Sequence, residues 1–152
     1  MRLAVALVGK SKCAWAESAV EDYARRLRRH GSLEVRVAKP EKFRGDVESV
    51  RAAEADRLLK LVRPREQLVA LDERGEGLDT HGFSAMLESL ALEGTVVFAI
   101  GGAYGLHARV RHRAQRVVRL SDLVLNHEVA RVVLYEQLYR AAAIRAGIPY
   151  HH

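Results

Sequence analysis

The segment Thr95–Leu106, TVVFAIGGAYGL, decides how this chain is to be interpreted. Its first half is an apolar run with the length of a buried strand, and its second half carries glycines at positions 101, 102 and 105. Glycine lets the backbone approach a ligand where a Cβ would block it, or adopt a positive φ at little cost. We therefore expect a buried strand, Thr95–Ile100, that runs into a loop built to hold a ligand, with a side chain at position 102 expected to obstruct that ligand.

Runs of alternating or continuous apolar residues and stretches of helical periodicity lie on both sides of this segment. They predict further strands at 2–8, 33–38, 67–72 and 117–120, and helices at 14–29, 47–62, 79–92, 108–116 and 127–147. On the first helix, the residues at every fourth position are expected to form the buried stripe: Trp15, Ala19, Tyr23 and Leu27. Strands alternating with helices indicate an α/β fold with a doubly wound, mainly parallel sheet. No linker or repeat divides residues 1–152, which predicts a single domain.

Polar and glycine-rich loops follow three of the predicted strands. Leu71-Asp72, Gly101-Gly102 and Ser121–Asn126 all stand at strand ends, where parallel sheets bind ligands. The glycine spacing is G-G-x-x-G, and the acidic residue Asp72 precedes the glycines, whereas a dinucleotide fingerprint has G-x-G-x-x-G with the acid following. These differences argue against a dinucleotide site. A tight strand-to-helix connection without a ligand is the alternative for this loop.

The charge balance indicates a polyanionic partner. The chain has 25 Lys and Arg against 19 Asp and Glu, a net charge of +6, and the arginine-rich composition favours nucleic acid, although GC-rich coding leaves the same mark. A single cysteine, Cys13, and the absence of a signal peptide or a long apolar run predict a cytoplasmic protein without a membrane segment.

A basic stripe follows the glycine loop. Arg109, Arg113 and Arg116 fall on one face of the predicted helix 108–116, which makes them candidates for RNA phosphate contacts, with a solvated helix face as the alternative. His107 and His112 are five residues apart on the same helix and point in different directions. We therefore expect no metal site.

Several of these segments recur together in one known family. The most specific are Leu71-Asp72, Ile100–Gly105, Leu120–His127, Glu136–Ala141 and the closing Pro149-Tyr150-His151. In this order and at these spacings the chain resembles, over essentially its full length, the RlmH family of SPOUT-class methyltransferases, which methylate N3 of a pseudouridine in 23S, large-subunit, ribosomal RNA.

The resemblance implies a C-terminal trefoil knot, a homodimer, and S-adenosylmethionine as the cofactor. By position, the cofactor-binding residues would be Leu71, Gly101, Gly102, Gly105, Ser121, Asp122, Leu123, Val124, Leu125 and Asn126. Two of these depart from the pattern, which has Thr at position 124 and Pro at position 126. Contacts made by the backbone would survive both changes, but a hydroxyl contact at position 124 would be lost.

The same resemblance, together with location, points to catalytic candidates at both ends of the last helix: His127, Arg140, Tyr150 and His151, with His152 beside them. Because chain ends fray unless they are held, we expect the tail to be fixed against a partner subunit, giving a site composed of two chains. Large-subunit ribosomal RNA within the ribosome is the expected partner. The alternatives are a SPOUT methyltransferase acting on another RNA, such as transfer RNA, and a ribosome-binding factor without catalysis.

Overall fold

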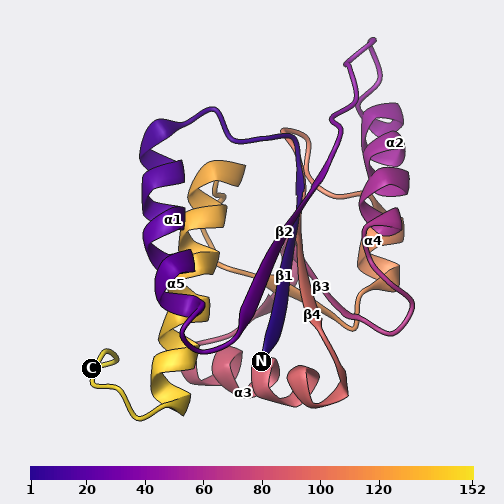
Figure 1. Cartoon of the computed structure of the whole chain (residues 1–152). Helices are drawn as coiled ribbons and strands as arrows, with labels where there is room; N and C mark the ends of the chain where they lie inside the picture. Colours follow the sequence, from indigo (N-terminus) through magenta and orange to yellow (C-terminus); the bar gives the residue numbers. More distant parts are fainter.

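The computed structural model describes all residues 1–152 and contains one five-stranded sheet with every neighbouring pair parallel (Figure 1). The strand order is β2-β1-β4-β3-β5. The strands are β1 (Arg2–Val8), β2 (Ser32–Ala38), β3 (Gln67–Gly77), β4 (Val96–Ile100) and β5 (Arg116–Arg119). The helices are α1 (Ala14–Leu27), α2 (Val47–Lys60), α3 (Thr80–Glu93), α4 (Ala108–Arg113) and α5 (His127–Arg145). The predicted α/β class and doubly wound parallel sheet are confirmed.

Helices cover both faces of the sheet, and the alternation of side chains along each strand divides the core into two layers. Figure 1 shows α1, α3 and α5 on one face of the sheet and α2 and α4 on the other. Leu3, Val5 and Leu7 of β1 pack with the first group of helices, whereas Ala4 and Ala6 pack with the second. The first layer holds the large aliphatic and aromatic residues, and the second is rich in alanine. Small side chains let α2 and α4 lie close to the sheet.

The buried stripe of α1 differs from the predicted one. Ala16, Val20, Ala24 and Leu27 are buried, whereas Trp15 is 56% exposed. A strict four-residue spacing drifts around a helix of 3.6 residues per turn, so a stripe that begins one residue later stays on the core side as far as Leu27. The prediction was therefore wrong for Trp15.

The region after β3 also differs. The predicted end at Asp72 is too early, because β3 continues to Gly77 and pairs with β5 again after a register shift between Leu71 and Glu76. Gly75 makes this possible, since a Cβ there would lie 2.6 Å from the backbone of Val117 and Val118.

Helix α4 is shorter than predicted. It ends at Arg113 because Gln115 joins the edge of β3, donating its backbone N–H to the Leu68 carbonyl at 2.8 Å and accepting the Leu68 N–H on its side chain at 2.6 Å. Arg116 therefore lies in β5. The predicted single helix face carrying Arg109, Arg113 and Arg116 is wrong.

The polypeptide crosses the molecule between its last two elements. β5 forms the sheet edge beside β3, and α5 then packs beside α1 on the opposite side from α2 and α4 (Figure 1). The C-terminal tail lies at the end of the molecule remote from the carboxyl ends of the strands (Figure 1). None of the helices combines the length and the apolar character needed to cross a bilayer.

Candidate functional site

A pocket of about 650 Å³ opens beside the carboxyl ends of β4 and β5 and the irregular part of β3 that follows Leu71. Its volume is in the range of small-molecule sites. Three loops far apart in the sequence line it, which confirms that the predicted strand-end loops converge. Of the predicted cofactor residues and His127, the lining includes Leu71, Gly101, Gly102, Gly105, Ser121, Leu123, Val124, Leu125, Asn126 and His127. Asp122 does not line it, because its side chain is 88% exposed and pairs with Arg119.

A second cavity, of about 220 Å³, lies near the amino end of β1 and the C-terminal ends of α1 and α5. Most of its lining residues are hydrophobic, and none of the predicted site residues is among them. The larger pocket is therefore the candidate site.

The three glycines of the loop after β4 have different structural roles. Gly105 adopts φ +79°, which confirms the need for a positive φ at one of them. A Cβ at Gly101 would lie 2.6 Å from the Gly105 backbone, so residue 101 must be small for the loop to close on itself. A Cβ at Gly102 would meet Glu54 Oε1 at 3.0 Å and Val8 at 3.2 Å. A side chain at position 102 would therefore press on α2 and β1 behind the loop. Because Gly102 also lines the pocket, the obstruction of a ligand by a side chain there stays a prediction.

Glu54 supports this loop from behind. The residue is 5% exposed, its Oε2 accepts the Glu41 N–H at 3.1 Å, and its Oε1 has no hydrogen-bond partner. Burial raises the pKa of the Glu54 carboxyl, partly opposed by the Glu41 N–H and by Arg57. Periodicity placed this position on a helix, but nothing in the sequence indicated that a carboxylate would be buried against the glycine loop.

The acidic end of β3 is neutralised within the chain. The side chain of Asp72 is 5% exposed, accepts from Arg111 at 3.1 Å and accepts the Arg74 N–H at 2.9 Å. Arg111 also donates to the Leu106 carbonyl at 2.9 Å, which ties the end of β3 to the segment after the glycine loop. Asp72 is therefore a structural carboxylate in an ion pair.

The segment before α5 forms the mouth of the pocket. Leu123 and Val124 are 76% and 81% exposed although both are apolar. Asn126 caps α5 by accepting the Val129 N–H at 2.9 Å, a bond that a proline side chain at this position could not make. His127, half-exposed, begins α5 at the pocket.

The chain is similar in sequence to a known protein family. Residues 1–151 match the family model described as "Predicted SPOUT methyltransferase". The chain belongs to the SPOUT methyltransferase family. It is 42% identical over 154 residues, covering the full length of both chains, to a Geobacter sulfurreducens protein named "Ribosomal RNA large subunit methyltransferase H". A Geobacter metallireducens protein with the same name is 42% identical over 156 residues and is covered to 99%. The resemblance inferred from the motifs is confirmed.

Solved structures agree with the fold. A probable methyltransferase from Bordetella pertussis superposes with a TM-score of 0.58 at 17% identity, covering 93% of this chain and 94% of that one. A probable methylase family protein from Haemophilus influenzae gives the same TM-score at 12% identity, with 99% of this chain and 70% of that one covered. At these identities the likeness concerns the SPOUT fold alone.

The other predicted catalytic residues of this SPOUT chain form a compact cluster around Glu136. Its Oε1 accepts from Arg140 and from the Tyr150 hydroxyl, at 3.0 Å from Arg140 Nε and 3.1 Å from the hydroxyl. Arg140 stacks on the Tyr150 ring at 4.6 Å and reaches Nδ1 of His151 at 3.3 Å. The Tyr23 hydroxyl, partial burial and Glu136 raise the pKa of Tyr150 above its ordinary value, so its hydroxyl, protonated at neutral pH like that of any tyrosine, stays protonated to higher pH. The tail is thus held by its own subunit, whereas the expectation was that a partner would hold it.

This cluster is far from the pocket of the same subunit. Arg140 follows His127 by 13 positions on one helix, which corresponds to about 20 Å along its axis. Neither Arg140 nor the tail lines the pocket. The structure therefore brings His127 to the pocket and gathers Arg140, Tyr150 and His151 elsewhere, while His152 is exposed at the chain end.

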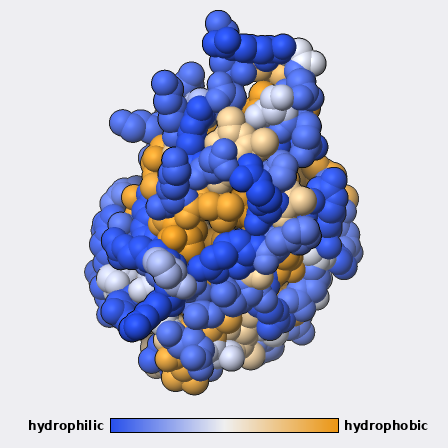
Figure 2. Space-filling model, turned by 90° about the vertical axis from the view of Figure 1, so that its right-hand side faces the viewer, coloured by the Kyte–Doolittle hydropathy of each residue, from blue (hydrophilic) through white to orange (hydrophobic).

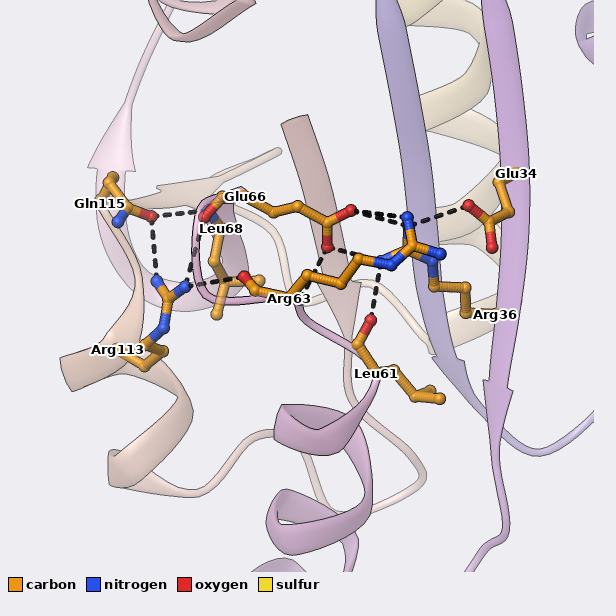
Figure 3. Close-up of polar contacts among 8 residues, drawn as sticks. All are labelled: Glu34, Arg36, Leu61, Arg63, Glu66, Leu68, Arg113 and Gln115. Atoms are coloured by element: carbon orange, nitrogen blue, oxygen red, sulfur yellow. Dashed lines mark hydrogen bonds and ion pairs between the residues drawn. The ribbon is translucent and has the colours of Figure 1, made fainter. Parts of the chain in front are cut away.

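The three predicted RNA-binding arginines are engaged inside the subunit. Arg109 pairs with Asp56 at 2.5 Å, and Arg116 pairs with Glu76 at 2.5 Å. Arg113 points inward, toward the Glu66 carbonyl at 3.3 Å and Gln115 at 3.4 Å (Figure 3). Beside it in the same view, the buried Arg36 pairs with Glu66. These contacts join α4 and β5 to their neighbours, so an RNA contact would compete with them.

Several pocket residues carried no recognisable signal in the sequence. Arg51 reaches the pocket from α2 and donates to the Tyr104 carbonyl at 2.6 Å, and Tyr104 itself lies at the rim. Arg74 and Arg119 add two further cations from the ends of β3 and β5. Only long-range packing makes Arg51 a neighbour of a loop more than 50 positions away.

Proposed function

We propose that this SPOUT chain is an S-adenosylmethionine-dependent methyltransferase that methylates N3 of a pseudouridine in 23S ribosomal RNA, within the ribosome and as a homodimer. One observation carries the proposal. Three strand-end loops converge on one pocket in a chain that is 42% identical, over its full length, to proteins named for methylation of large-subunit ribosomal RNA.

The pocket suits S-adenosylmethionine by chemistry. Leu71, Ile100 and Leu125 provide apolar surface for an adenine ring, and the backbone of residues 121–126 provides donors and acceptors for its polar edge. Gly101 and Gly105 keep the opposite wall thin. When bound, this cofactor supplies an electrophilic methyl group on a sulfonium sulfur.

Methylation at N3 requires loss of an imide proton, with negative charge spreading onto the two flanking carbonyl oxygens. Groups that only donate, placed in advance, stabilise that charge. Arg140 is such a group, with Glu136 fixing its orientation. Because a guanidinium only donates, Nδ1 of His151 accepts from Arg140, and the neutral imidazole then presents Nε2–H as a second donor. The protonated Tyr150 hydroxyl is a donor to Glu136 and supports the position of both.

A composite site reconciles these roles with the separation along α5. Two chains paired with α5 in opposite directions would bring His127 and the pocket of one subunit to Arg140 and the tail of the other. Leu123 and Val124 at the pocket, and Trp15 on α1, are exposed apolar residues that offer surface for such a contact. The same proposal includes the trefoil knot, which would involve residues 120–126, the segment that connects β5 to α5.

The decisive experiment is methyl transfer from radiolabelled S-adenosylmethionine to intact ribosomes, separated large subunits and transfer RNA, followed by mass spectrometry of the nucleosides. Label in N3-methylpseudouridine from ribosomal substrates supports the proposal. Label in transfer RNA alone would assign another RNA substrate, and cofactor binding without any transfer would leave a ribosome-binding factor.

A further inference from the structure

The loop between β2 and α2 carries cations that nothing in the chain neutralises. Lys39, Lys42 and Arg44 are exposed, and none of their side chains forms an ion pair or hydrogen bond within the chain. They differ in this from Arg109, Arg113 and Arg116, which all have internal partners. Unpaired cations are the groups free to bind phosphate.

An exposed aromatic pair lies beside these cations. Phe43, from the same loop, packs on Tyr104 of the glycine loop with ring centroids 5.7 Å apart. The two residues remain 49% and 38% exposed, which is unusual for large rings in contact. Tyr104 also lines the pocket, so the pair is located on its rim.

Hydrogen bonds hold both ends of this loop in place, whereas the side chains of Lys42 and Arg44 at its tip form none. Arg57 donates to the Lys39 carbonyl at 3.0 Å and to Glu41 at 2.6 Å, and the Glu41 N–H is held by Glu54. At the other end Asp46 caps α2. The tip projects above α2 at the carboxyl ends of the strands (Figure 1), and hydrophilic residues cover it at the top of Figure 2.

From these contacts we infer that Phe43 and Tyr104, flanked by Lys39, Lys42 and Arg44, form a docking platform for a single-stranded RNA segment at the rim of the pocket. Bases stack on exposed aromatic rings while cations follow the backbone, and single-stranded RNA is recognised in this way. A base on this pair would lie next to the methyl-donor pocket that Tyr104 lines. The inference rests on the proposed RNA substrate and specifies which surface receives it.

A second copy of the chain is the rival occupant. An isologous contact through this loop would bring two sets of unpaired cations together, and like charges oppose such a contact. Charge complementarity therefore favours RNA.

The test uses the full-length protein, a labelled single-stranded RNA of about 12 nucleotides, and purified large ribosomal subunits. Phe43→Ala should raise the Kd for RNA about 5- to 100-fold, the loss expected for one stacked base. Phe43→Leu should weaken binding similarly because it keeps bulk without a π face, whereas Phe43→Tyr should bind like wild type. Thermal unfolding of each variant checks that the fold is retained.

The salt dependence tests the cations. Replacing Lys42 and Arg44 by Ala should make the negative slope of log K against log salt shallower by about 1.4, which is the value for two phosphate contacts on a single strand. The control replaces two exposed cations remote from the loop, Lys60 and Arg29, and should leave the slope near that of wild type.

The inference would be overturned by unchanged RNA affinity in Phe43→Ala together with an unchanged salt-dependence slope in the Lys42 and Arg44 double variant. The proposed function would remain intact in that case if the wild-type protein still methylates ribosomal RNA. A shift in the sedimentation of Phe43→Ala, without loss of RNA affinity, would assign the pair to an interface between copies and overturn the inference too. A wild-type protein that binds neither RNA nor ribosomal subunits would overturn both proposals.

Discussion

The conformation of the glycine loop depends on the absence of a Cβ atom at individual positions. Gly101 has no room for a Cβ because the Gly105 backbone passes 2.6 Å from where that atom would lie, and Gly105 itself adopts φ +79°. Gly102 instead packs against Glu54, whose Oε1 is buried without a partner. The three positions are therefore constrained by the chain's own packing before any ligand is considered.

Gly101→Ala should lower the affinity for S-adenosylmethionine by at least about tenfold, because a displacement that costs about 1.4 kcal/mol in binding has that effect. The loop must open to accept the added methyl group, while the sheet beneath it is untouched. Isothermal titration calorimetry measures the affinity, and thermal unfolding provides the control for the fold. Wild-type affinity in a folded variant would mean that the closed loop is not part of the cofactor site.

The raised pKa of the buried Glu54 carboxyl predicts that the free energy of unfolding depends on pH. Burial raises its pKa in the folded state, so its contribution to the free energy of unfolding is fully present below the unfolded value of about 4.5 and is lost as the pH rises through the folded pKa. Each unit by which the pKa is raised costs about 1.4 kcal/mol at neutral pH. Glu54→Gln removes this loss.

The difference in unfolding free energy between Glu54→Gln and wild type should therefore increase in favour of the variant from pH 4.5 to neutral pH, as measured by urea unfolding across that range. Glu88→Gln, at an exposed carboxyl of α3 that forms no ion pair, controls for the loss of one charge. A difference that does not vary with pH would show that Glu54 is not held in an unfavourable ionised state.

Helix α5 separates the two groups of candidate catalytic residues. His127 lies at its N-terminal end in the pocket, whereas Arg140 lies near the other end with the tail folded back on it. The fold-back begins at Gly147, with φ +66°, and the Ile148 N–H donates to the Ala143 carbonyl at 2.9 Å. A continuous helix keeps the two groups about 20 Å apart.

Removal of Tyr150–His152 should reduce methyl transfer to ribosomes at least about tenfold, which requires the loss of only about 1.4 kcal/mol of transition-state stabilisation. The affinity for S-adenosylmethionine should stay near that of wild type because the tail does not line the pocket. The melting temperature should fall by a few degrees, since Tyr150 packs on Tyr139 and bonds Glu136.

A truncated protein that loses cofactor affinity as well would show that the tail of one or the other subunit contributes to cofactor binding, and would contradict this prediction. Tyr150→Phe keeps the ring packing but removes the hydroxyl that Glu136 accepts, so it tests the positioning of Arg140 separately from the packing of the tail.

In the whole molecule, the candidate pocket and the basic, aromatic tail cluster lie at opposite ends of α5. A symmetric dimer can bring these ends together twice, once at each site, because two-fold symmetry repeats every contact. Under the proposed function, each site would be completed by the partner chain.

Mixing Gly101→Ala subunits with subunits lacking Tyr150–His152 should give more activity than either parent shows alone. A heterodimer would hold one site with an intact loop and an intact tail, so random exchange should recover about a quarter of the wild-type sites. Methyl transfer is measured after subunit exchange has been verified by mass spectrometry. A mixture that exchanges fully and remains inactive would assign the tail to its own subunit or show that a single complete site does not function.

Much of the fold could be predicted because it depends on local patterns. The five strands and five helices follow from apolar runs and helical periodicity, and the strand-end position of the three pocket loops follows from parallel topology. The errors arose where distant contacts overrode the local pattern. Gln115 pairs with Leu68 and ends α4, and Glu76 and Gly77 return to the sheet beside β5.

By itself, the sequence determined the α/β class, the order of the elements and the residue types at the ends of β3, β4 and β5, because these depend on neighbours within a few positions. Only the tertiary structure decided that Arg109, Arg113 and Arg116 have internal partners, that the side chains of Lys42 and Arg44 have none, and that Arg140 and the tail lie away from the pocket. The physical reason is that an ion pair or a buried contact depends on which groups meet after packing, and partners of these three arginines lie 40 to 53 positions away along the chain.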